Sequence, residues 1–352
     1  MLLLIDELLK LSVEVEVVSI NPIGQLGPLL DERGVLNEGS TYSGPWGLFS
    51  ILRLHRILSQ KRADGLLMIG HNLMGELALG RLWKKHRALS IHYHHRGVKS
   101  PIIWKLIYYI AVNKFRSIIF VSDYIKQEAL QIVPFLSKKE LFVSTQVETH
   151  PPFTHKERLE ARIALKIPVD TLVVGNAGWL IERKRWDVYL QVAAKVIKQE
   201  PTVRFIIAGD GPLREDLKKM ALDLGVANNI IWLGWQSDLL PFYRSIDILL
   251  FNSDWDAQAR TPLESMSYGI PVVASVLEGG TKEMITDPSM GILFDDHNVD
   301  SLAEAIIRMK RDPVQMEKTG SAGRQRVLVQ ASPKDHAQRV LAAMGFPVMG
   351  DY

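Results

Sequence analysis

The chain alternates short apolar, β-branched runs with stretches of helical periodicity along its whole length. Each run is followed by turn residues and a helical stretch, a pattern that predicts βα units on parallel sheets. In the first half the predicted strands are 13–19, 66–69, 89–93 and 117–121. In the second half they are 172–177, 204–208, 230–233, 246–251 and 272–274. The predicted fold class is therefore α/β, with doubly wound parallel sheets.

A break in this alternation divides the chain. The segment 149–153 contains Pro151 and Pro152, and adjacent prolines suit neither a helix nor a central strand. A length of 352 residues fits two domains of about 100–200 residues each. We predict one Rossmann-like domain over 1–150, a second over 151–330, and a C-terminal helix and tail over 331–352. Such sheets bind ligands at the carboxyl ends of their strands, so the two domains are expected to face each other across a cleft.

Composition limits the chemistry that is open to the chain. Cysteine is absent, which excludes disulfides, thiolate zinc sites, iron–sulfur clusters and cysteine nucleophiles. No run reaches about 18 uncharged apolar residues, the length of a membrane-spanning helix. The nearest run, 101–112, contains Lys105 and fits either a buried core helix or a helix in a membrane interface. The first residues lack the basic start of a signal peptide, so a cytoplasmic location is expected.

Basic residues are concentrated in the first half. Between Glu76 and Asp123 there is no acidic residue, and the basic residues of this interval are Arg81, Lys84, Lys85, Arg87, Arg96, Lys99, Lys105, Lys114 and Arg116. We call this interval the basic 81–116 region. It is either a solvated face or a surface that attracts anions, such as anionic lipid or a phosphorylated acceptor. Nucleic acid is not expected as a partner.

Two loops and one helix start in the second half could bind a phosphorylated ligand. Gly209-Asp210-Gly211-Pro212-Leu213 follows strand 204–208, and its glycines permit a tight turn that exposes backbone N–H groups. The loop after strand 172–177 gathers three consecutive cations, Arg183-Lys184-Arg185, where a diphosphate would fit electrostatically. Asp256 and Glu264 flank a helix start at Pro262, and such carboxylates can accept hydrogen bonds from sugar hydroxyls.

Taken together, these segments resemble a known family. Gly209 to Leu213, Leu233-Gly234-Trp235, the Asp-x7-Glu string, Gly269 to Ala274 and Glu278 to Glu283 look like the family-4 retaining glycosyltransferases of GT-B fold, also described as glycosyl transferases group 1. The match covers roughly 165–330 in order. A weaker resemblance runs through the first half.

The resemblance implies roles for individual residues. Lys184 matches the lysine that binds the donor diphosphate, Glu264 the acid that holds the ribose, and Asp256 the acid that contacts the transferred sugar. Gly234 and Trp235 match the positions that contact the base. The remaining residues implied in donor binding are Gly178, Gly209, Thr261, Pro262 and Leu263.

A histidine cluster ends one strand of the first half. His94, rather than its neighbour His95, matches the family histidine near the anomeric centre. His92 and His94 alternate and would share one strand face, as a metal pair could. The acid-free interval around them offers no carboxylate ligand, so no metal is expected, and we predict a catalytic set of His94, Asp256 and Lys184.

Three features depart from the family pattern. Trp179 replaces a diphosphate-binding arginine, for which Arg183 or Arg185 could compensate. Asp256 stands where glutamate is usual, which places the carboxylate on the order of 1.5 Å further from the sugar. The segment 1–10 is predicted as the family's first helix, so the chain is expected to lack the strand and glycine-rich loop that precede it.

The resemblance therefore implies a retaining transferase that moves a sugar from a nucleoside-diphosphate donor to a hydroxyl acceptor, without cofactor or metal. The acceptor would be a glycan or a lipid-linked molecule, bound by the first domain near the inner face of the plasma membrane. The alternatives are a non-catalytic sugar-nucleotide or glycan-binding relative, and a sugar-nucleotide epimerase or hydrolase on the same architecture.

Overall fold

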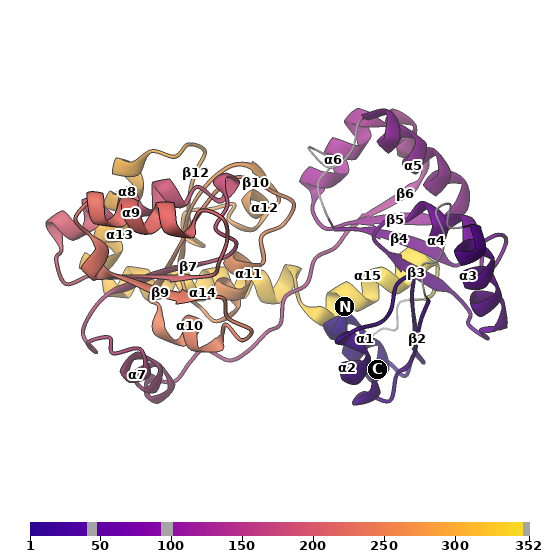
Figure 1. Cartoon of the computed structure of the whole chain (residues 1–352), viewed down its shortest axis with the longest axis horizontal. Helices are drawn as coiled ribbons and strands as arrows, with labels where there is room; N and C mark the ends of the chain where they lie inside the picture. Colours follow the sequence, from indigo (N-terminus) through magenta and orange to yellow (C-terminus); the bar gives the residue numbers. More distant parts are fainter. Residues whose placement is uncertain (41–47, 93–100, 348–352) are drawn as a thin grey trace. The chain divides into compact units, whose positions relative to one another are not determined.

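The computed structural model describes residues 1–40, 48–92 and 101–347. The chain forms two compact units (Figure 1). The first unit comprises residues 1–146 together with the segment from Ala331 onward, and the second comprises Val147–Gln330. The segment that we predicted as a separate C-terminal helix and tail is therefore part of the first unit.

The main sheet of the first unit is parallel and has the order β3-β4-β5-β6. Its strands are β3 (Leu66–Ile69), β4 (Arg87–Ile91), β5 (Ser117–Phe120) and β6 (Glu140–Val143). Its helices are α3 (Leu48–Gln60), α4 (Leu73–Ala78), α5 (Pro101–Lys114), α6 (Asp123–Ile132) and the 3-10 turn η1 (Pro134–Lys138). The side chains of β4 and β5 are buried throughout, as expected for central strands of an α/β sheet.

The C-terminal helix α15 (Pro333–Met344) packs against this sheet (Figure 1). Ala337, Val340 and Ala343 are buried against Ala88 and Ile119 of the sheet. The spacing of three residues places these side chains on one face of the helix, which explains why this amphipathic segment folds back onto the first unit. The hydroxyl of Ser117 donates to the Ala343 carbonyl at 2.6 Å.

A second, smaller sheet of the first unit pairs β1 (Glu16–Ser19) with β2 (Leu36–Gly39) in parallel. Its helices are α1 (Leu2–Lys10) and α2 (Leu26–Asp31), and the predicted helix over 1–10 is therefore confirmed. Within the described ranges, no strand pairs with both β1 and β3. β3 is consequently an edge strand, and its Ile69 is 46% exposed.

The second unit is a six-stranded parallel sheet with the order β12-β11-β10-β7-β8-β9. Its strands are β7 (Val173–Ala177), β8 (Arg204–Ala208), β9 (Ile230–Gly234), β10 (Ile248–Asp256), β11 (Val272–Gly279) and β12 (Ile292–Phe294). Its helices and 3-10 turns are α7 (His155–Ala164), η2 (Glu182–Lys184), α8 (Trp186–Gln199), α9 (Arg214–Asp223), η3 (Ala227–Asn229), α10 (Leu240–Ser245), α11 (Arg260–Ser267), α12 (Thr281–Met284), α13 (Val299–Arg311) and α14 (Pro313–Gln330).

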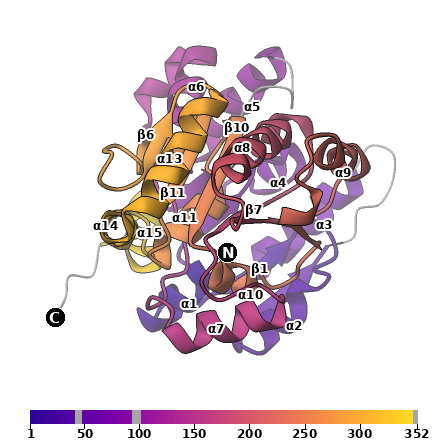
Figure 2. The same cartoon turned by 90° about the vertical axis from the view of Figure 1, so that its left-hand side faces the viewer.

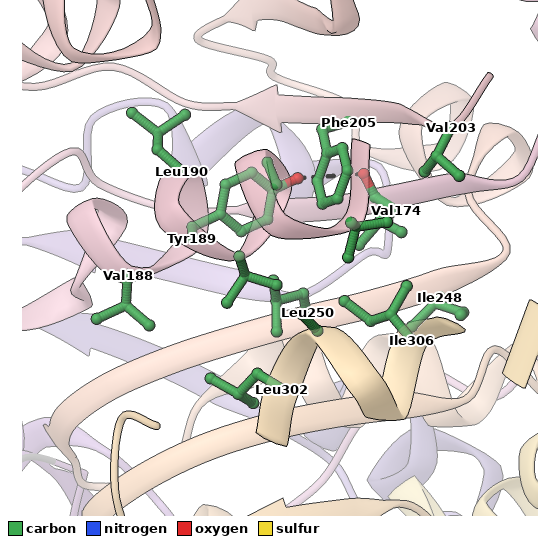
Figure 3. Close-up of a cluster of buried hydrophobic side chains, with 14 of the residues drawn as sticks. Val174, Val188, Tyr189, Leu190, Val203, Phe205, Ile248, Leu250, Leu302 and Ile306 are labelled. Atoms are coloured by element: carbon green, nitrogen blue, oxygen red, sulfur yellow. Dashed lines mark hydrogen bonds between the residues drawn. The ribbon is translucent and has the colours of Figure 1, made fainter. Parts of the chain in front are cut away.

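Helices α8 and α13 lie side by side on this sheet (Figure 2). In α8, Val188, Val192 and Val196 recur every four residues and therefore face the sheet together. Figure 3 shows Tyr189 of the same helix beside Phe205. The Tyr189 hydroxyl lies 3.1 Å from the Val174 carbonyl. The hydroxyl is also 3.0 Å from the Ile206 carbonyl, so this buried polar group has partners in two neighbouring strands.

Two strands of the second unit extend beyond their predicted ends, which is a correction that bears on the site. β10 continues to Asp256 and β11 to Gly279, with Trp255 opposite Glu278 and Asp256 opposite Gly279. The residues directly after Phe251 are polar and interrupt the apolar run, so the sequence alone predicts an earlier end of β10. Gly279 allows this register, because a Cβ there would lie 2.0 Å from the Asp256 carbonyl oxygen.

The apolar run 101–112 forms most of α5, whose Trp104 and Tyr108 are buried in the first unit. None of the helices in the described part of the chain is long and apolar enough to cross a bilayer.

Candidate active site

The candidate site lies in the second unit, at the carboxyl ends of β7 and β10. From this pair of neighbours, the strand order runs through β8 and β9 on one side and through β11 and β12 on the other. A reversal of this kind leaves a crevice outside the carboxyl ends of the two central strands. The loop that follows β7 carries the predicted residue Lys184 to this crevice, and the predicted residue Asp256 is the last residue of β10.

Lys184 ends the short 3-10 turn η2, and its neighbour Arg185 holds that turn in place. Arg185 has a φ of 45°, in the left-handed region that few non-glycine residues adopt. Its guanidinium donates to Asp187 at 3.0 and 2.9 Å and to Asp254 at 3.3 Å. Asp254 also accepts from the ring of His297 at 3.0 Å. The contact between Arg185 and Asp254 therefore connects the loop after β7 to the end of β10.

Lys184 and Asp256 contact each other directly. The Lys184 ammonium lies 2.5 Å from the Asp256 carboxylate, and both side chains are largely buried. Burial lowers the pKa of Lys184, and the attraction of Asp256 opposes that shift. The same Asp256 oxygen lies 3.1 Å from the hydroxyl of Ser253 and 3.4 Å from the guanidinium of Arg183. Asp256 is thus already surrounded by three donors.

Arg183 and Arg185 differ as substitutes for the arginine that Trp179 replaces. Arg183 stacks over the Trp255 ring at 4.3 Å and donates to the Trp255 carbonyl at 3.0 Å, beside Lys184 and Asp256. Arg185 is engaged by two carboxylates of its own, as described above. Arg183 is therefore the better placed of the two, and one carboxylate faces two cations at this point of the site.

The predicted glycines bring three loops close together. Gly209 donates its N–H to the Gly234 carbonyl at 2.7 Å, and a Cβ at Gly209 would lie 1.9 Å from the Gly178 carbonyl oxygen. A Cβ at Gly178 would meet nothing within 4 Å. Gly209 thus serves the close approach of two loops, whereas Gly178 borders open space. Trp179 and Trp235 follow these glycines and are 61% and 69% exposed.

The start of α11 lies beside the end of β7, because the Thr261 hydroxyl donates to the Ala177 carbonyl at 3.0 Å. Pro262 and Leu263 are buried, so at these two positions only the backbone can meet a ligand. The N-cap residue Ala259 makes no side-chain capping bond, which leaves N–H groups of the first turn available for an anion.

Glu264 projects from α11 and is held by two side chains. The hydroxyl of Tyr243, on α10, donates to one carboxylate oxygen at 2.6 Å, and Arg260 donates to the other at 3.1 Å. Burial and the negative charge of Glu264 raise the pKa of Tyr243, which keeps its hydroxyl protonated as a donor. The carboxylate keeps partial access to solvent.

No role is predicted for Ser253 or Tyr243 from the sequence alone. Ser253 stands within the quoted Asp-x7-Glu segment, but Tyr243 precedes Glu264 by 21 residues and nothing local connects them. The predicted catalytic residue His94 lies outside the described residues. Across the ranges that are described, no group of three or more His, Asp or Glu side chains is arranged to hold a metal ion.

Comparisons with known proteins place this geometry in context. The family described as glycosyl transferases group 1 matches residues 157–326. Lipopolysaccharide core biosynthesis glycosyltransferase LpsE of Rhizobium meliloti (strain 1021) is 32% identical over 162 residues, or 46% of each chain. Poly(ribitol-phosphate) alpha-N-acetylglucosaminyltransferase of Staphylococcus aureus (strain COL) is 23% identical over 210 residues, or 60% of this chain and 43% of that protein. The chain spans about half the length of these curated relatives, or slightly less.

A solved structure is similar over nearly the whole chain. Anabaena Alr3699/HepE in complex with UDP superposes with a TM-score of 0.83 at 16% identity, covering 98% of this chain and 94% of that chain. At this level of identity the likeness concerns the fold alone. The predicted GT-B fold is thereby confirmed.

Proposed function

We propose that this chain transfers a sugar from a nucleoside-diphosphate donor to a hydroxyl acceptor. The proposal is supported by the match of residues 157–326, within the second unit, to the family described as glycosyl transferases group 1. The products would be a glycan, polysaccharide or glycolipid, as the names of the lipopolysaccharide and poly(ribitol-phosphate) relatives suggest. We further propose that the transfer retains the anomeric configuration and needs neither cofactor nor metal.

One observation carries this proposal: two cations and one carboxylate meet at the carboxyl ends of β7 and β10. Arg183 and Lys184 share Asp256, so this cluster has a net positive charge in a largely buried place. A diphosphate bound there would be stabilised more than in water, because the local dielectric constant is low. The N–H groups at the start of α11 would add donors to the same anion.

The other predicted residues would each bind a different part of the donor. Glu264 would accept the ribose hydroxyls, and Trp235 with Gly234 would contact the base. Gly178 borders open space, so its backbone could approach a phosphate or the sugar. Asp256 would hold the transferred sugar once the diphosphate has taken over its contact with Lys184. We propose that the first unit binds the acceptor and supplies His94.

Removal of the Glu264 carboxylate is expected to weaken donor binding strongly. The Glu264→Ala variant should bind UDP-glucose about tenfold to 100-fold more weakly, because a hydrogen bond to a charged group contributes roughly 1.5–3 kcal/mol. Tyr243→Phe should show a smaller loss of about fivefold, since it removes only the hydrogen bond that orients the carboxylate. Calorimetry with UDP-, GDP- and ADP-glucose measures both and identifies the base.

The matched control is Glu215→Ala, which removes an exposed carboxylate from α9 of the same unit. Donor binding that is equal in Glu264→Ala and Glu215→Ala would contradict the ribose assignment. Tight binding of a donor by the wild type without transfer to any acceptor would favour the alternative, a non-catalytic sugar-nucleotide-binding relative. Sugar release without an acceptor would indicate a hydrolase instead.

We also propose that the first unit rests on the cytoplasmic face of an anionic membrane. Helix α5 presents Ile102, Leu106 and Tyr109 on one face, where they are 79%, 54% and 62% exposed. These apolar side chains lie within the basic 81–116 region. An exposed apolar stripe next to basic residues is typical of helices that lie in a membrane interface.

The Leu106→Glu variant is expected to bind phosphatidylglycerol-containing vesicles about tenfold more weakly than the wild type. The reason is the lost burial of one leucine side chain, worth roughly 1.5–3 kcal/mol, together with an added negative charge. Vesicle flotation at low and high salt measures this. Val314→Glu changes an equally exposed apolar residue of the second unit and should bind like the wild type. Equal binding by Leu106→Glu would contradict the proposal.

A further inference from the structure

A cavity of about 390 Å³ lies at the amino end of the main sheet of the first unit, the edge opposite to the carboxyl ends of its strands. Its volume lies within the range of small-ligand pockets, about 300–1,000 Å³. The lining residues come from three segments that lead into β4, β5 and β6: Lys84, Lys85, His86, Asn113, Lys114, Phe115, Arg116 and Lys139.

This lining contains five cationic side chains and no carboxylate. In the part of the chain that the structure describes, the side chains of Lys84, Lys85 and Lys114 make no hydrogen bond and no close ion pair. Arg116 is paired with Glu140 at 3.1 Å, and Lys139 donates to the Phe115 carbonyl at 2.9 Å. Like charges gathered around one cavity repel each other, so an anion in the cavity would lower the energy of the fold.

Arg87 follows the lining residue His86 and adds a buried positive charge near the cavity. Among the residues that the structure describes, its side chain donates to the backbone carbonyls of Leu79, Gly80, Leu82 and Lys114. Two carbonyls at the end of α5, those of Lys114 and Phe115, are therefore occupied by Arg87 and Lys139. The negative end of that helix is thus partly covered, and the ammonium groups dominate the charge that a ligand would meet.

The turn that presents Lys84 and Lys85 has an unusual backbone. Trp83 has a φ of 47°, a left-handed conformation that is rare for a bulky residue, and its carbonyl accepts from the His86 N–H at 2.9 Å. The His86 ring stacks on Phe346 at 4.8 Å, and one of its nitrogens lies 3.0 Å from the Met344 carbonyl. The turn that carries Lys84 and Lys85 is therefore fixed by the contacts of its neighbour His86.

We propose that this cavity is a second anion site, which binds the phosphate groups of a ligand that carries at least two of them. Ammonium groups on flexible stems suit phosphate, which can be approached from several directions. The site is separate from the proposed donor site, because all of its residues belong to the first unit. The proposal does not depend on the proposed sugar transfer.

The test uses inorganic pyrophosphate and the full chain in the Lys184→Ala background, so that binding at the proposed donor site does not obscure the result. Calorimetry should show one pyrophosphate bound, and Lys85→Ala with Lys114→Ala should weaken it about tenfold or more. The control pair Arg56→Ala with Arg62→Ala removes two exposed cations of the same unit that do not line the cavity. It should change the affinity less than about twofold.

Two outcomes would overturn the proposal: no saturable binding of pyrophosphate, or equal losses in the cavity pair and the control pair. The single variant Lys85→Gln, which changes one exposed side chain, should give an intermediate affinity if the double variant fails to fold. A vesicle arm separates the sources of the phosphate. If pyrophosphate displaces the protein from vesicles that contain cardiolipin, a lipid whose headgroup carries two phosphates, the site takes lipid headgroups; if it does not, the site takes a soluble phosphate compound.

Discussion

The Lys184→Ala variant is expected to transfer sugar about 100-fold to 1,000-fold more slowly than the wild type. Lys184 is largely buried and reaches the carboxyl edge between β7 and β10, where the leaving diphosphate would gain negative charge. A preorganised cation at such a position stabilises the transition state more than the bound substrate. Removing one such group costs roughly 2.7–4 kcal/mol in comparable sites. Product formation from the donor identified by calorimetry, measured as kcat and KM, tests this expectation.

The division between kcat and KM indicates what the lysine does. A fall in kcat with little change in donor affinity would assign Lys184 to the leaving group, whereas a rise in KM alone would assign it to uniform donor binding. Lys195→Ala is the matched control, because Lys195 is a lysine of α8 whose partner is the exposed Asp300. Unchanged kcat and KM in Lys184→Ala would contradict the site assignment altogether.

Asp256, which stands where the family usually has glutamate, is the direct partner of Lys184. Its carboxylate contacts Lys184, Arg183 and Ser253, so in this structure it holds the lysine. A donor diphosphate would compete with Asp256 for Lys184. We therefore expect the binding of a phosphate group at Lys184 to be coupled to the release of the Asp256 carboxylate.

Most of the fold could be predicted because the signals are local. Apolar β-branched runs and helical spacing identified the long, buried strands of both sheets. The strands β2, β6 and β12 were missed, and all three are short, lie at sheet edges and are only partly buried. The packing of α15 on the first unit could not be predicted, because an amphipathic helix does not specify which surface will cover its apolar face.

The candidate site, too, could be predicted only in part from the sequence. The order of motifs along the second half identified Lys184, Asp256 and Glu264 as candidate site residues. Lys184 ends η2, Asp256 ends β10, and Glu264 lies on the short helix α11. Their partners could not be predicted. Lys184 and Asp256 are 72 residues apart, and Tyr243 reaches Glu264 from another helix. Contacts of this kind depend on which strands become neighbours, a property of the whole sheet.

A buried carboxyl group in the first unit carries the second large prediction. Glu76, on α4, is 1% exposed, and neither carboxylate oxygen has a hydrogen-bond partner among the residues that the structure describes. Burial raises the pKa of Glu76 from its ordinary value of 4.5 to about 7, although the charge of Lys114 acts in the opposite direction. The folded chain therefore keeps this carboxyl protonated over a range in which the unfolded chain has lost the proton.

The sign of the effect on stability follows from this difference. Below pH 4.5 the group is protonated in both states and does not distinguish them. Between pH 4.5 and about 7 only the unfolded state ionises fully, so the free energy of unfolding falls as the pH rises. Above about pH 7 the loss is complete and amounts to about 3 kcal/mol, because each pH unit that separates the folded and unfolded pKa values contributes roughly 1.4 kcal/mol.

The Glu76→Gln variant removes this titration. Its free energy of unfolding, minus that of the wild type, is expected to rise by about 3 kcal/mol from pH 4.5 to about pH 7.5. Denaturant unfolding at several pH values, followed by circular dichroism, measures the difference. Glu14→Gln changes an exposed carboxylate of the same unit and is the matched control.

A flat profile for Glu76→Gln would contradict the prediction and would mean that the pKa of this carboxyl group is the same in the folded and the unfolded chain. Lys114→Gln provides an independent check, because the Lys114 charge is the influence that lowers the pKa of Glu76. Without that charge, the fall in stability should extend to higher pH. Since Lys114 also lines the basic cavity, pyrophosphate bound there would weaken its attraction for Glu76 and should move the profile in the same direction.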